Sequence, residues 1–289
     1  MTTIFKDEKA EREYHGYYDA SLQMFELPWT STYVHTSYGD THVVTFGDSS
    51  KPPLILLHGM TMSSTMWYPN VKQFVEERYV MAIDLSGDFG KSKPSTAIKN
   101  KLEAARWLSE VMDGLHIQSA DIAGHSMGGF VALNYAISFP QRVSKLLLYA
   151  PAGTFYRMNP KFFIKIYPAL LFHTERLIDK AFRWFSAWNQ PLQQPVFRNQ
   201  IIAGYRSAKP SLQVMPSVFS EAELRACKVP TLLLVGDQEV IYPAEKAIAN
   251  ARRHMPNIEA HLIHGANHAL TIEHAEVVND YSIRYLRQA

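Results

Sequence analysis

Short apolar runs alternate with longer stretches of helical periodicity along most of the chain. Four unbroken apolar runs, typical of strands buried on both faces, cover residues 54–57, 80–83, 146–149 and 232–235. Stretches that predict helices lie near residues 66–77, 99–114, 127–139 and 244–254. Because strands that alternate with helices build a parallel sheet covered on both faces, we expect an α/β fold with a mostly parallel sheet of about eight strands.

The first fifty residues follow a different pattern. Aromatic and apolar residues recur at helical spacing over residues 8–26 and predict a helix that Pro28 ends. Residues 32–36 and 42–46 are strand-like, and residues 37–40 between them have the composition of a turn. The sheet is therefore expected to begin with an antiparallel hairpin.

Residues 152–226 interrupt the alternation because they contain no strand-like run. They carry aromatic side chains at helical spacing, among them Phe162, Phe163, Phe182, Trp184 and Phe185. We interpret them as a helical cap inserted after the sixth strand into a core formed by residues 1–151 and 227–289. Such a cap covers the crevice at the carboxyl ends of the strands, so some of its aromatics are expected to face a pocket.

Composition narrows the class of protein. The 289 residues allow one large domain or a domain with an insertion. The 29 basic and 27 acidic residues are interspersed, so no nucleic-acid partner is expected. A single cysteine, Cys227, excludes an internal disulfide framework and makes the cytoplasm the expected compartment. No apolar run approaches the roughly 18 residues of a membrane span, and the first residues mix acids and bases, so neither export nor a membrane partner is expected.

Residues 124–128 read Gly-His-Ser-Met-Gly, a Gly-x-Ser-x-Gly pattern between a strand-like run and a helical stretch. A serine on a sharp turn between strand and helix has strained backbone angles that expose its hydroxyl, and glycines on either side let the flanking backbones approach. The bare pattern also arises by accident, but here both neighbouring elements are present. Ser126 is therefore the candidate nucleophile.

Serine is a poor nucleophile without a base within hydrogen-bond reach. His268 follows the last strand-like segment, residues 258–263, on a loop that leaves the same edge of the sheet as Ser126. Three other histidines fit less well because they lie within that strand, at its end or in the following helix, namely His261, His264 and His274. We expect His268 to be the base.

An acid that orients the base is expected after the penultimate strand, where Asp237 and Glu239 share one loop. Asp237 follows the strand directly and is expected to pin the turn. Glu239 lies further out on the loop, just ahead of two apolar residues. Glu239 is the preferred candidate, and Asp237 is the alternative.

A tetrahedral intermediate needs two N–H donors for its oxyanion. The turn supplies the backbone N–H of Met127, which begins the helix after Ser126. The second donor is expected from the loop after residues 54–57, where Met60 follows a His-Gly pair, and its N–H is the candidate. An ordinary turn would also explain this His-Gly pair, but its place in the order of elements is the one that the mechanism requires.

Four motifs in this order resemble the α/β-hydrolase fold superfamily: His-Gly at residues 58–59, the serine motif at 124–129, the acidic loop at 236–239 and Gly-x-x-His at 265–268. The resemblance spans roughly residues 30–289. It implies a catalytic triad and two oxyanion donors, formed by Ser126, Glu239, His268, Met60 and Met127.

Residues 63–70, 151–152, 218–219 and 240–242 make the chain similar to Bacillus-type carboxylesterases that hydrolyse aryl-propionate esters. The chain departs from the superfamily pattern in two places. The acid is glutamate where aspartate is commoner, and residues 84–92 hold one residue more than the usual Asp-x-x-Gly-x-Gly-x-Ser, which leaves the shape of that loop open.

The residues and the resemblance together predict a serine hydrolase that cleaves carboxylic esters of small to medium apolar or aryl acids through an acyl-enzyme intermediate. The sequence lacks His-Glu-x-x-His, Cys-x-x-Cys and the glycine-rich nucleotide motifs, so no metal and no cofactor are expected. Thioesterase, amidase, carbon–carbon bond hydrolase and perhydrolase activities stay open because the nucleophile does not separate them. A non-catalytic small-molecule receptor and a homodimer also stay open.

Overall fold

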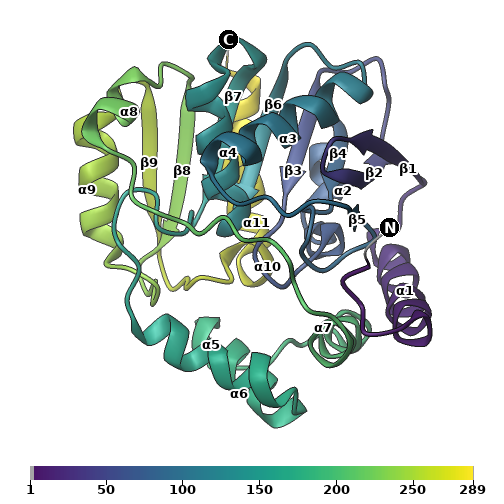
Figure 1. Ribbon diagram of the computed structural model, residues 1–289. Helices are drawn as coiled ribbons and strands as arrows, with labels where there is room; N and C mark the ends of the chain where they lie inside the picture. Colours follow the sequence, from purple (N-terminus) through teal and green to yellow (C-terminus); the bar gives the residue numbers. More distant parts are fainter. Residues whose placement is uncertain (1–2, 289) are drawn as a thin grey trace.

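The computed structural model describes residues 3–288, whose strands form one sheet (Figure 1). Its nine strands are β1 (Trp29–Thr36), β2 (Gly39–Phe46), β3 (Pro53–Leu57), β4 (Tyr79–Ile83), β5 (Lys93–Pro94), β6 (Ala120–His125), β7 (Val143–Tyr149), β8 (Thr231–Gly236) and β9 (Ile258–Ile263). The order is β1-β2-β4-β3-β6-β7-β8-β9, and β5 pairs with β2 beside this path. The predicted sheet of about eight strands is confirmed, with the two-residue β5 in addition.

The strands from β4 to β9 along this path pair in parallel, whereas β2 is antiparallel to both β1 and β4. The hairpin of β1 and β2 confirms the predicted antiparallel start, and its turn places Thr36 opposite Gly39. Gly39 has a φ of 115°, and an added Cβ would lie 2.2 Å from the carbonyl oxygen of Lys93. Glycine therefore lets β5 approach the hairpin.

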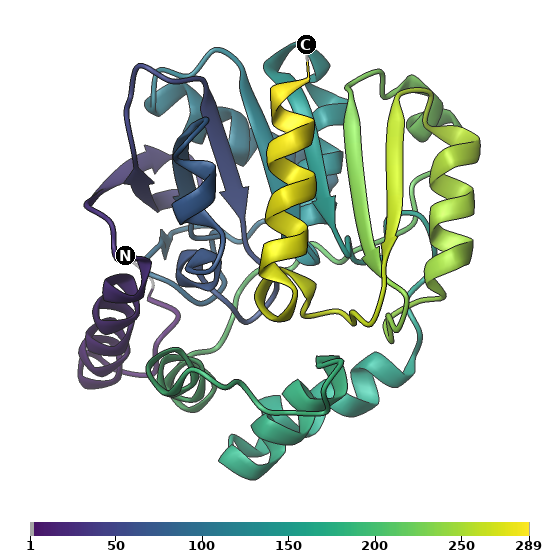
Figure 2. The same cartoon turned by 180° about the vertical axis from the view of Figure 1, so that it is seen from behind.

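Helices cover both faces of the sheet. One face is covered by α3 (Lys101–Gly114), α4 (Met127–Ser138) and α9 (Ala244–His254), and the other by α2 (Val71–Phe74) and α11 (Ala275–Arg287) (Figure 1, Figure 2). A single turn, α10 (Leu270–Glu273), precedes α11. This two-sided cover explains why β6 and β8 are buried at every position. Within residues 3–288 no helix has the length and apolar character needed to cross a bilayer.

The helix predicted over residues 66–77 is wrong in its extent. The chain forms a 3-10 turn at Ser64–Trp67 and then the single helical turn of α2. Pro69 lies between them, and proline has no N–H to donate and disfavours helical angles in the residue before it. The helix predicted over residues 8–26 is α1 (Glu8–Leu22), followed by a 3-10 turn at Gln23–Phe25.

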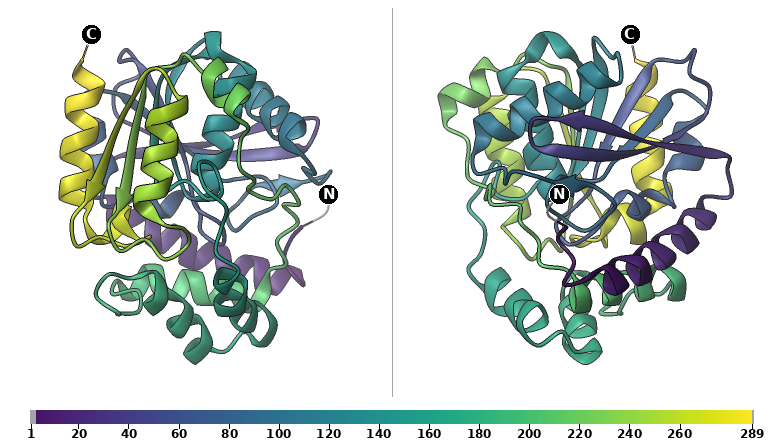
Figure 3. Two further views of the ribbon diagram at one scale, coloured as in Figure 1. Left: turned by 90° about the vertical axis from the view of Figure 1, so that its left-hand side faces the viewer. Right: turned by 45° about the vertical axis from the view of Figure 1, so that its right-hand side comes forward.

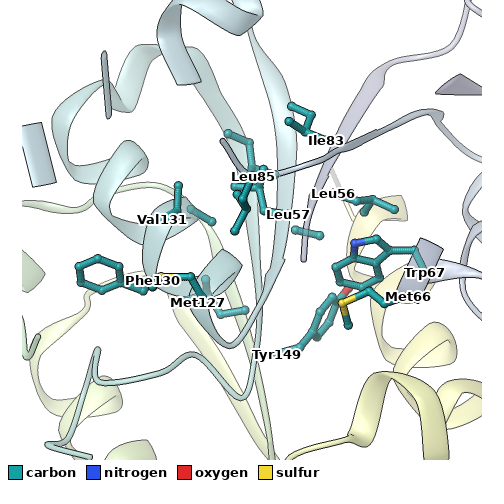
Figure 4. Close-up of a cluster of buried hydrophobic side chains, with 14 of the residues drawn as sticks. Leu56, Leu57, Met66, Trp67, Ile83, Leu85, Met127, Phe130, Val131 and Tyr149 are labelled. Carbon is teal, nitrogen blue, oxygen red and sulfur yellow. The ribbon is translucent and has the colours of Figure 1, made fainter. Parts of the chain in front are cut away.

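Large apolar side chains fill the space between the sheet and the helices. Figure 4 shows Phe130 and Val131 of α4 on one side of the central strands and Met66 and Trp67 on the other. All four side chains are at most 2% exposed. Burial of one large apolar side chain stabilises a fold by about 1.5–3 kcal/mol, so this packing holds the central strands firmly in place.

Four helices lie between β7 and β8, namely α5 (Lys161–Phe172), α6 (Glu175–Phe185), α7 (Pro195–Ser207) and α8 (Glu221–Ala226). The first three lie beyond the carboxyl ends of the parallel strands (Figure 3), whereas α8 packs against α4 and α9. The amide of Gln200 in α7 donates to Tyr14 Oη at 3.1 Å and to Ser63 Oγ at 2.8 Å, which ties this insertion to α1 and to the loop after β3. The division of the chain at residues 152 and 226 stays a prediction.

Candidate active site

Ser126 lies at a sharp turn between β6 and α4. Its φ of 52° and ψ of −112° are strained for a residue with a side chain. The turn is held by its backbone, because the N–H of Ser126 donates to the carbonyl of Tyr149 at 3.0 Å and its carbonyl accepts the N–H of Ala152 at 3.0 Å. This strand-turn-helix context is the one that the sequence predicted.

The two glycines of the pattern allow close packing around the turn. A Cβ on Gly128 would lie 2.0 Å from the carbonyl oxygen of Leu57, and a Cβ on Gly124 would lie 2.3 Å from the carbonyl oxygen of Gly128. Only glycine at both positions lets α4 begin this close to β3 and β6. The loop after β3 is thereby brought next to Ser126.

His268, on the loop after β9, reaches Ser126 although 142 positions separate them in the sequence. Its Nε2 lies 2.9 Å from Ser126 Oγ, and its Nδ1 lies 2.8 Å from Oε2 of Glu239. Ser126 and His268 are 8% and 6% exposed, and the side chain of Glu239 is fully buried. Because Nδ1–H donates to the carboxylate, Nε2 is free to accept the proton of the serine hydroxyl.

The two carboxylates on the loop after β8 contact different partners. Glu239 faces His268, and its second oxygen accepts the N–H of Ile241 at 2.8 Å. The carboxylate of Asp237 accepts the N–H of Gly265 at 3.0 Å and lies 2.8 Å from Nδ1 of His264. Asp237 thus links the loops after β8 and β9, and it is Glu239 that hydrogen-bonds the imidazole of His268.

The loop that carries His268 is also held by the insertion. Asn267 Oδ1 accepts the backbone N–H of His268 at 2.7 Å, and Asn267 Nδ2 donates to the carbonyl of Trp184 at 3.3 Å. The N–H of Ala269 donates to the carbonyl of Phe185 at 3.2 Å. The position of His268 therefore depends on the end of α6 as well as on the sheet.

The residue before Ser126 also contacts His268, although the sequence pattern does not single it out. The Nε2–H of His125 donates to the backbone carbonyl of His268 at 2.9 Å, and the two ring centres lie 5.0 Å apart. Burial, assisted by the nearby His268, lowers the pKa of His125 to about 3, so this ring is neutral near pH 7. No local signal reveals this contact, because its partners are 143 positions apart.

The loop after β3, residues 58–62, runs beside Ser126, and a Cβ on Gly59 would lie 3.5 Å from Cβ of Ser126. Burial lowers the pKa of His58 and keeps its ring neutral. Its Nε2 accepts the N–H of Leu85 at 2.8 Å, so its Nδ1–H donates to the carbonyl of Gly59 at 2.8 Å. In a trans peptide the N–H points opposite to the carbonyl, so holding this carbonyl sets the direction of the N–H of Met60.

Met127 is the first residue of α4, and its backbone N–H therefore has no acceptor within the helix. The start of a helix also carries partial positive charge, which favours a negatively charged group. The two N–H groups expected as oxyanion donors, those of Met60 and Met127, thus belong to the two segments that border Ser126.

A cavity of about 70 Å³ opens beside Ser126 and His268. Its apolar wall includes Met60, Met62, Phe162, Ile166, Phe182, Phe185, Leu192 and Tyr205. The expectation that some aromatics of the insertion face a pocket is confirmed by the three phenylalanines of this wall. Phe163 points elsewhere and is 42% exposed.

A second cavity of about 180 Å³ adjoins the first and shares Phe182, Leu192, Ala269 and Ile272 with it. Its lining also includes polar side chains, among them Gln190, Gln193 and Gln194. A larger hollow of about 450 Å³ lies between α1 and α7, but half of its lining residues are charged and it contains none of the candidate site residues. The cavity at Ser126 is therefore the candidate site. No cluster of side chains in residues 3–288 is suited to hold a metal ion.

Comparison with known protein families matches residues 52–275 to a family described as the alpha/beta hydrolase fold. Two proteins of Bacillus subtilis (strain 168) are each 34% identical to this chain. The uncharacterized carboxylesterase nap aligns over 278 residues, which is 94% of this chain and 91% of that protein. Carboxylesterase YbfK aligns over 275 residues, which is 93% of this chain and 92% of that protein.

A comparison of structures gives the same result. The chain is similar to the crystal structure of naproxen esterase (carboxylesterase NP) from Bacillus subtilis, with a TM-score of 0.92 and 32% identity. The match covers 98% of this chain and 100% of that chain.

Proposed function

The chain belongs to the α/β-hydrolase fold family, and we propose that it is a serine carboxylesterase. One observation carries this proposal: His268 lies 2.9 Å from the hydroxyl of Ser126 and 2.8 Å from the carboxylate of Glu239, which are the contacts that an activated serine needs. The similarity to two carboxylesterases supports an ester, rather than another acyl derivative, as the substrate.

The hydrogen-bond pattern supports a role for each of the three side chains. Ser126 Oγ attacks the ester carbonyl while Nε2 of His268 takes the hydroxyl proton, and Glu239 stabilises the imidazolium that forms. When the tetrahedral intermediate collapses, the bond to the alcohol oxygen breaks and His268 gives its proton to that oxygen. A water activated by His268 then hydrolyses the acyl-enzyme, which releases the acid and restores Ser126.

The negative charge of the tetrahedral intermediate needs fixed donors in a site that excludes water. We assign the backbone N–H groups of Met60 and Met127 to this role because the carbonyl of Gly59 is held by His58 and because Met127 begins a helix. Each donor of this kind contributes about 100- to 1,000-fold to kcat in a comparable serine hydrolase.

The cavity walls favour a substrate with two apolar parts of unequal size. The space beside Ser126 is about 70 Å³ and mostly apolar, whereas the adjoining space is about 180 Å³. Burial of apolar surface contributes about 25 cal/mol per Å² to binding. We therefore propose esters of small to medium apolar or aryl acids, with one substituent in each cavity.

Related activities use the same nucleophile, and fold alone does not separate them. Thioesterase, amidase, carbon–carbon bond hydrolase and perhydrolase are the alternatives, and a non-catalytic receptor is a further one. Three further expectations stay predictions. They are the core and cap boundaries at residues 152 and 226, the cytoplasmic compartment, and the absence of a nucleic-acid, membrane, metal or cofactor partner. The homodimer stays open.

A screen of the purified protein tests the proposal. The substrates are p-nitrophenyl esters of rising chain length, acyl-CoA thioesters and an anilide, and Ser126→Ala serves as the control. We expect the esters to be turned over fastest and the control to be inactive. Preferential turnover of thioesters or of the anilide would assign another activity of the fold, and no turnover of any substrate would support the receptor.

A further inference from the structure

The loop after β4 carries a buried carboxylate that the proposed reaction does not use. Asp88 is 1% exposed. Among the ion pairs of residues 3–288, Asp84 of the same loop pairs with His42 at 2.9 Å, whereas Asp88 has no cationic partner. Burial of a carboxylate without a cation costs folding free energy unless hydrogen bonds compensate for the lost hydration. The hydrogen-bond donors around Asp88 are therefore informative about its role.

Asp88 binds the backbone of the loop after β3. Its two oxygens lie 3.1 and 3.0 Å from the backbone nitrogen of Thr61, and the first oxygen also accepts the N–H of Phe89 at 2.8 Å. Thr61 has a φ of 57°, a left-handed value that a β-branched residue rarely adopts. The carboxylate of Asp88 therefore holds Thr61 in a conformation that its own side chain disfavours.

The peptide between Met60 and Thr61 is held at both polar ends. Its N–H donates to Asp88, and its carbonyl accepts the hydroxyl of Thr61 at 2.7 Å. Because the hydroxyl proton of Thr61 goes to this carbonyl, Tyr205 of α7 is the donor in its 3.0 Å contact with Thr61 Oγ1. This peptide is thus held by Asp88 on the loop after β4 and, through Thr61 Oγ1, by Tyr205 of the insertion.

The preceding peptide, between Gly59 and Met60, supplies the proposed oxyanion donor. Its carbonyl accepts Nδ1–H of His58 at 2.8 Å and the N–H of Met62 at 3.2 Å. A rotation of the loop at Thr61 would turn both peptides and move the N–H of Met60 away from Ser126. Among the contacts that oppose this rotation, the one between Asp88 and the N–H of Thr61 acts on the backbone of Thr61 itself.

We propose that Asp88 is a positioning residue for the oxyanion hole, because it holds the backbone of Thr61 and thereby aims the N–H of Met60 at the carbonyl oxygen of the substrate. The inference rests on the proposed esterase function. Asp88 does not line the cavity and acts only through Thr61. Loss of its carboxylate should therefore weaken the transition state and leave ground-state binding of the ester unchanged.

Two substitutions separate this role from a merely structural one. Asp88→Leu keeps the branched shape of the side chain, adds volume and removes both acceptors. Asp88→Asn keeps one carbonyl oxygen, which can accept both N–H groups as the first oxygen of Asp88 does. The matched control is Asp121→Leu, which removes another buried carboxylate at the amino end of β6, where it pairs with Arg78 at 2.7 Å.

The readouts are kcat and KM for p-nitrophenyl butyrate and the inhibition constant of a trifluoromethyl ketone, whose adduct with serine carries the oxyanion. For Asp88→Leu we expect kcat to fall about 10- to 100-fold, KM to change less than about threefold and the inhibitor to weaken by the same factor as kcat. Asp88→Asn should recover part of the loss, because one of the two acceptors of the Thr61 N–H remains. Asp121→Leu should lower only the melting temperature.

The outcomes are distinguishable. If wild-type protein hydrolyses none of the esters, the proposed function fails together with this inference. If wild-type protein is active and folded Asp88→Leu retains its kcat and inhibitor affinity, only the role of Asp88 is wrong. If Asp88→Leu does not fold, Asp88→Ala is measured in its place. If neither variant folds and Asp88→Asn is fully active, Asp88 contributes to stability alone and the proposed positioning role is wrong.

Discussion

Nδ1 of His268 lies 2.8 Å from Oε2 of Glu239, and the two side chains are 8% and 0% exposed. A hydrogen bond to a charged acceptor is stronger than one between neutral groups, and burial shields it from water. The contact also selects the tautomer, because the proton on Nδ1 leaves Nε2 as the acceptor that faces Ser126. The contact therefore orients the imidazole of His268, the candidate base, and would stabilise its charged form.

The two carboxylates of the loop after β8 should respond differently to neutralisation. Glu239→Gln removes the charge that stabilises the imidazolium, and we expect kcat to fall about 1,000- to 10,000-fold. Asp237→Asn weakens the contacts to His264 and Gly265 and should lower the melting temperature with little change in kcat. Steady-state kinetics and thermal denaturation of both variants measure this, and the reverse ranking would transfer the role to Asp237.

The nucleophile can be identified by its covalent adduct. Ser126 is the serine whose hydroxyl lies 2.9 Å from a histidine nitrogen, so a fluorophosphonate should label it and abolish ester hydrolysis. Mass spectrometry of the labelled peptide locates the adduct. Ser126→Ala should take up no label and retain at best the weak catalysis of the oxyanion hole. An adduct on another serine would show that the assignment is wrong.

The walls of the cavity beside Ser126 should limit the chain length of the substrate. We expect kcat/KM for p-nitrophenyl esters to rise from acetate to a medium chain, because each buried CH₂ contributes about 0.8 kcal/mol, and then to fall for long chains that the walls exclude. Activity that climbs steadily to C16 esters and increases at an oil interface would instead indicate an open groove.

Two adjacent phenylalanines of α5 offer a matched control for the cavity wall. Phe162 lines the cavity and is 9% exposed, whereas Phe163 is 42% exposed. Phe162→Ala should move the preferred ester to a longer chain because it enlarges the cavity, and Phe163→Ala should leave the preference unchanged. Equal effects of the two substitutions would contradict this assignment of the wall.

Asp88 should also make stability depend on pH. Burial, assisted by the neighbouring charge of Asp84, raises the pKa of Asp88 from 3.8 to about 7. Below both values the carboxyl is protonated in the folded and unfolded chains and has no effect. As the pH rises towards 7 only the unfolded chain loses this proton, so the free energy of unfolding falls, by up to about 4 kcal/mol above pH 7.

Asp88→Asn does not titrate, so it isolates this effect. We expect the free energy of unfolding of wild-type protein, relative to that of Asp88→Asn, to decrease between about pH 4 and pH 7 and to level off above it. Urea denaturation followed by circular dichroism measures the difference. A difference that is constant over this range would mean that Asp88 titrates at its ordinary pKa.

Local patterns in the sequence were sufficient to predict most of the elements and to single out Ser126 as the candidate nucleophile. The unbroken apolar runs predicted β3, β4, β7 and β8 because a strand that is buried on both faces carries apolar residues at successive positions. The strain at Ser126 belongs to one turn, and the glycines that permit it are its near neighbours. His268 followed from the order of the elements, since the loops after parallel strands all leave the same edge of the sheet.

The helix prediction over residues 66–77 was wrong because helical periodicity and a proline occur in the same segment. Residues 66–77 have helical periodicity, but Pro69 interrupts the hydrogen bonding, and the chain forms two short turns there. Sequence periodicity reports which side chains share a face, whereas the proline decides whether the backbone can continue a helix through that point.

By itself, then, the sequence determined the sheet, the nucleophile turn and the order of the candidate catalytic groups, while side-chain direction was decided only by the tertiary structure. Glu239 and Asp237 are two positions apart, and packing of the loops after β8 and β9 turns only the first towards His268. In the same way, packing of α5 turns Phe162 inward and Phe163 outward. Asp88 meets Thr61 across 27 positions, a contact that no spacing encodes because it exists only once β3 and β4 are paired.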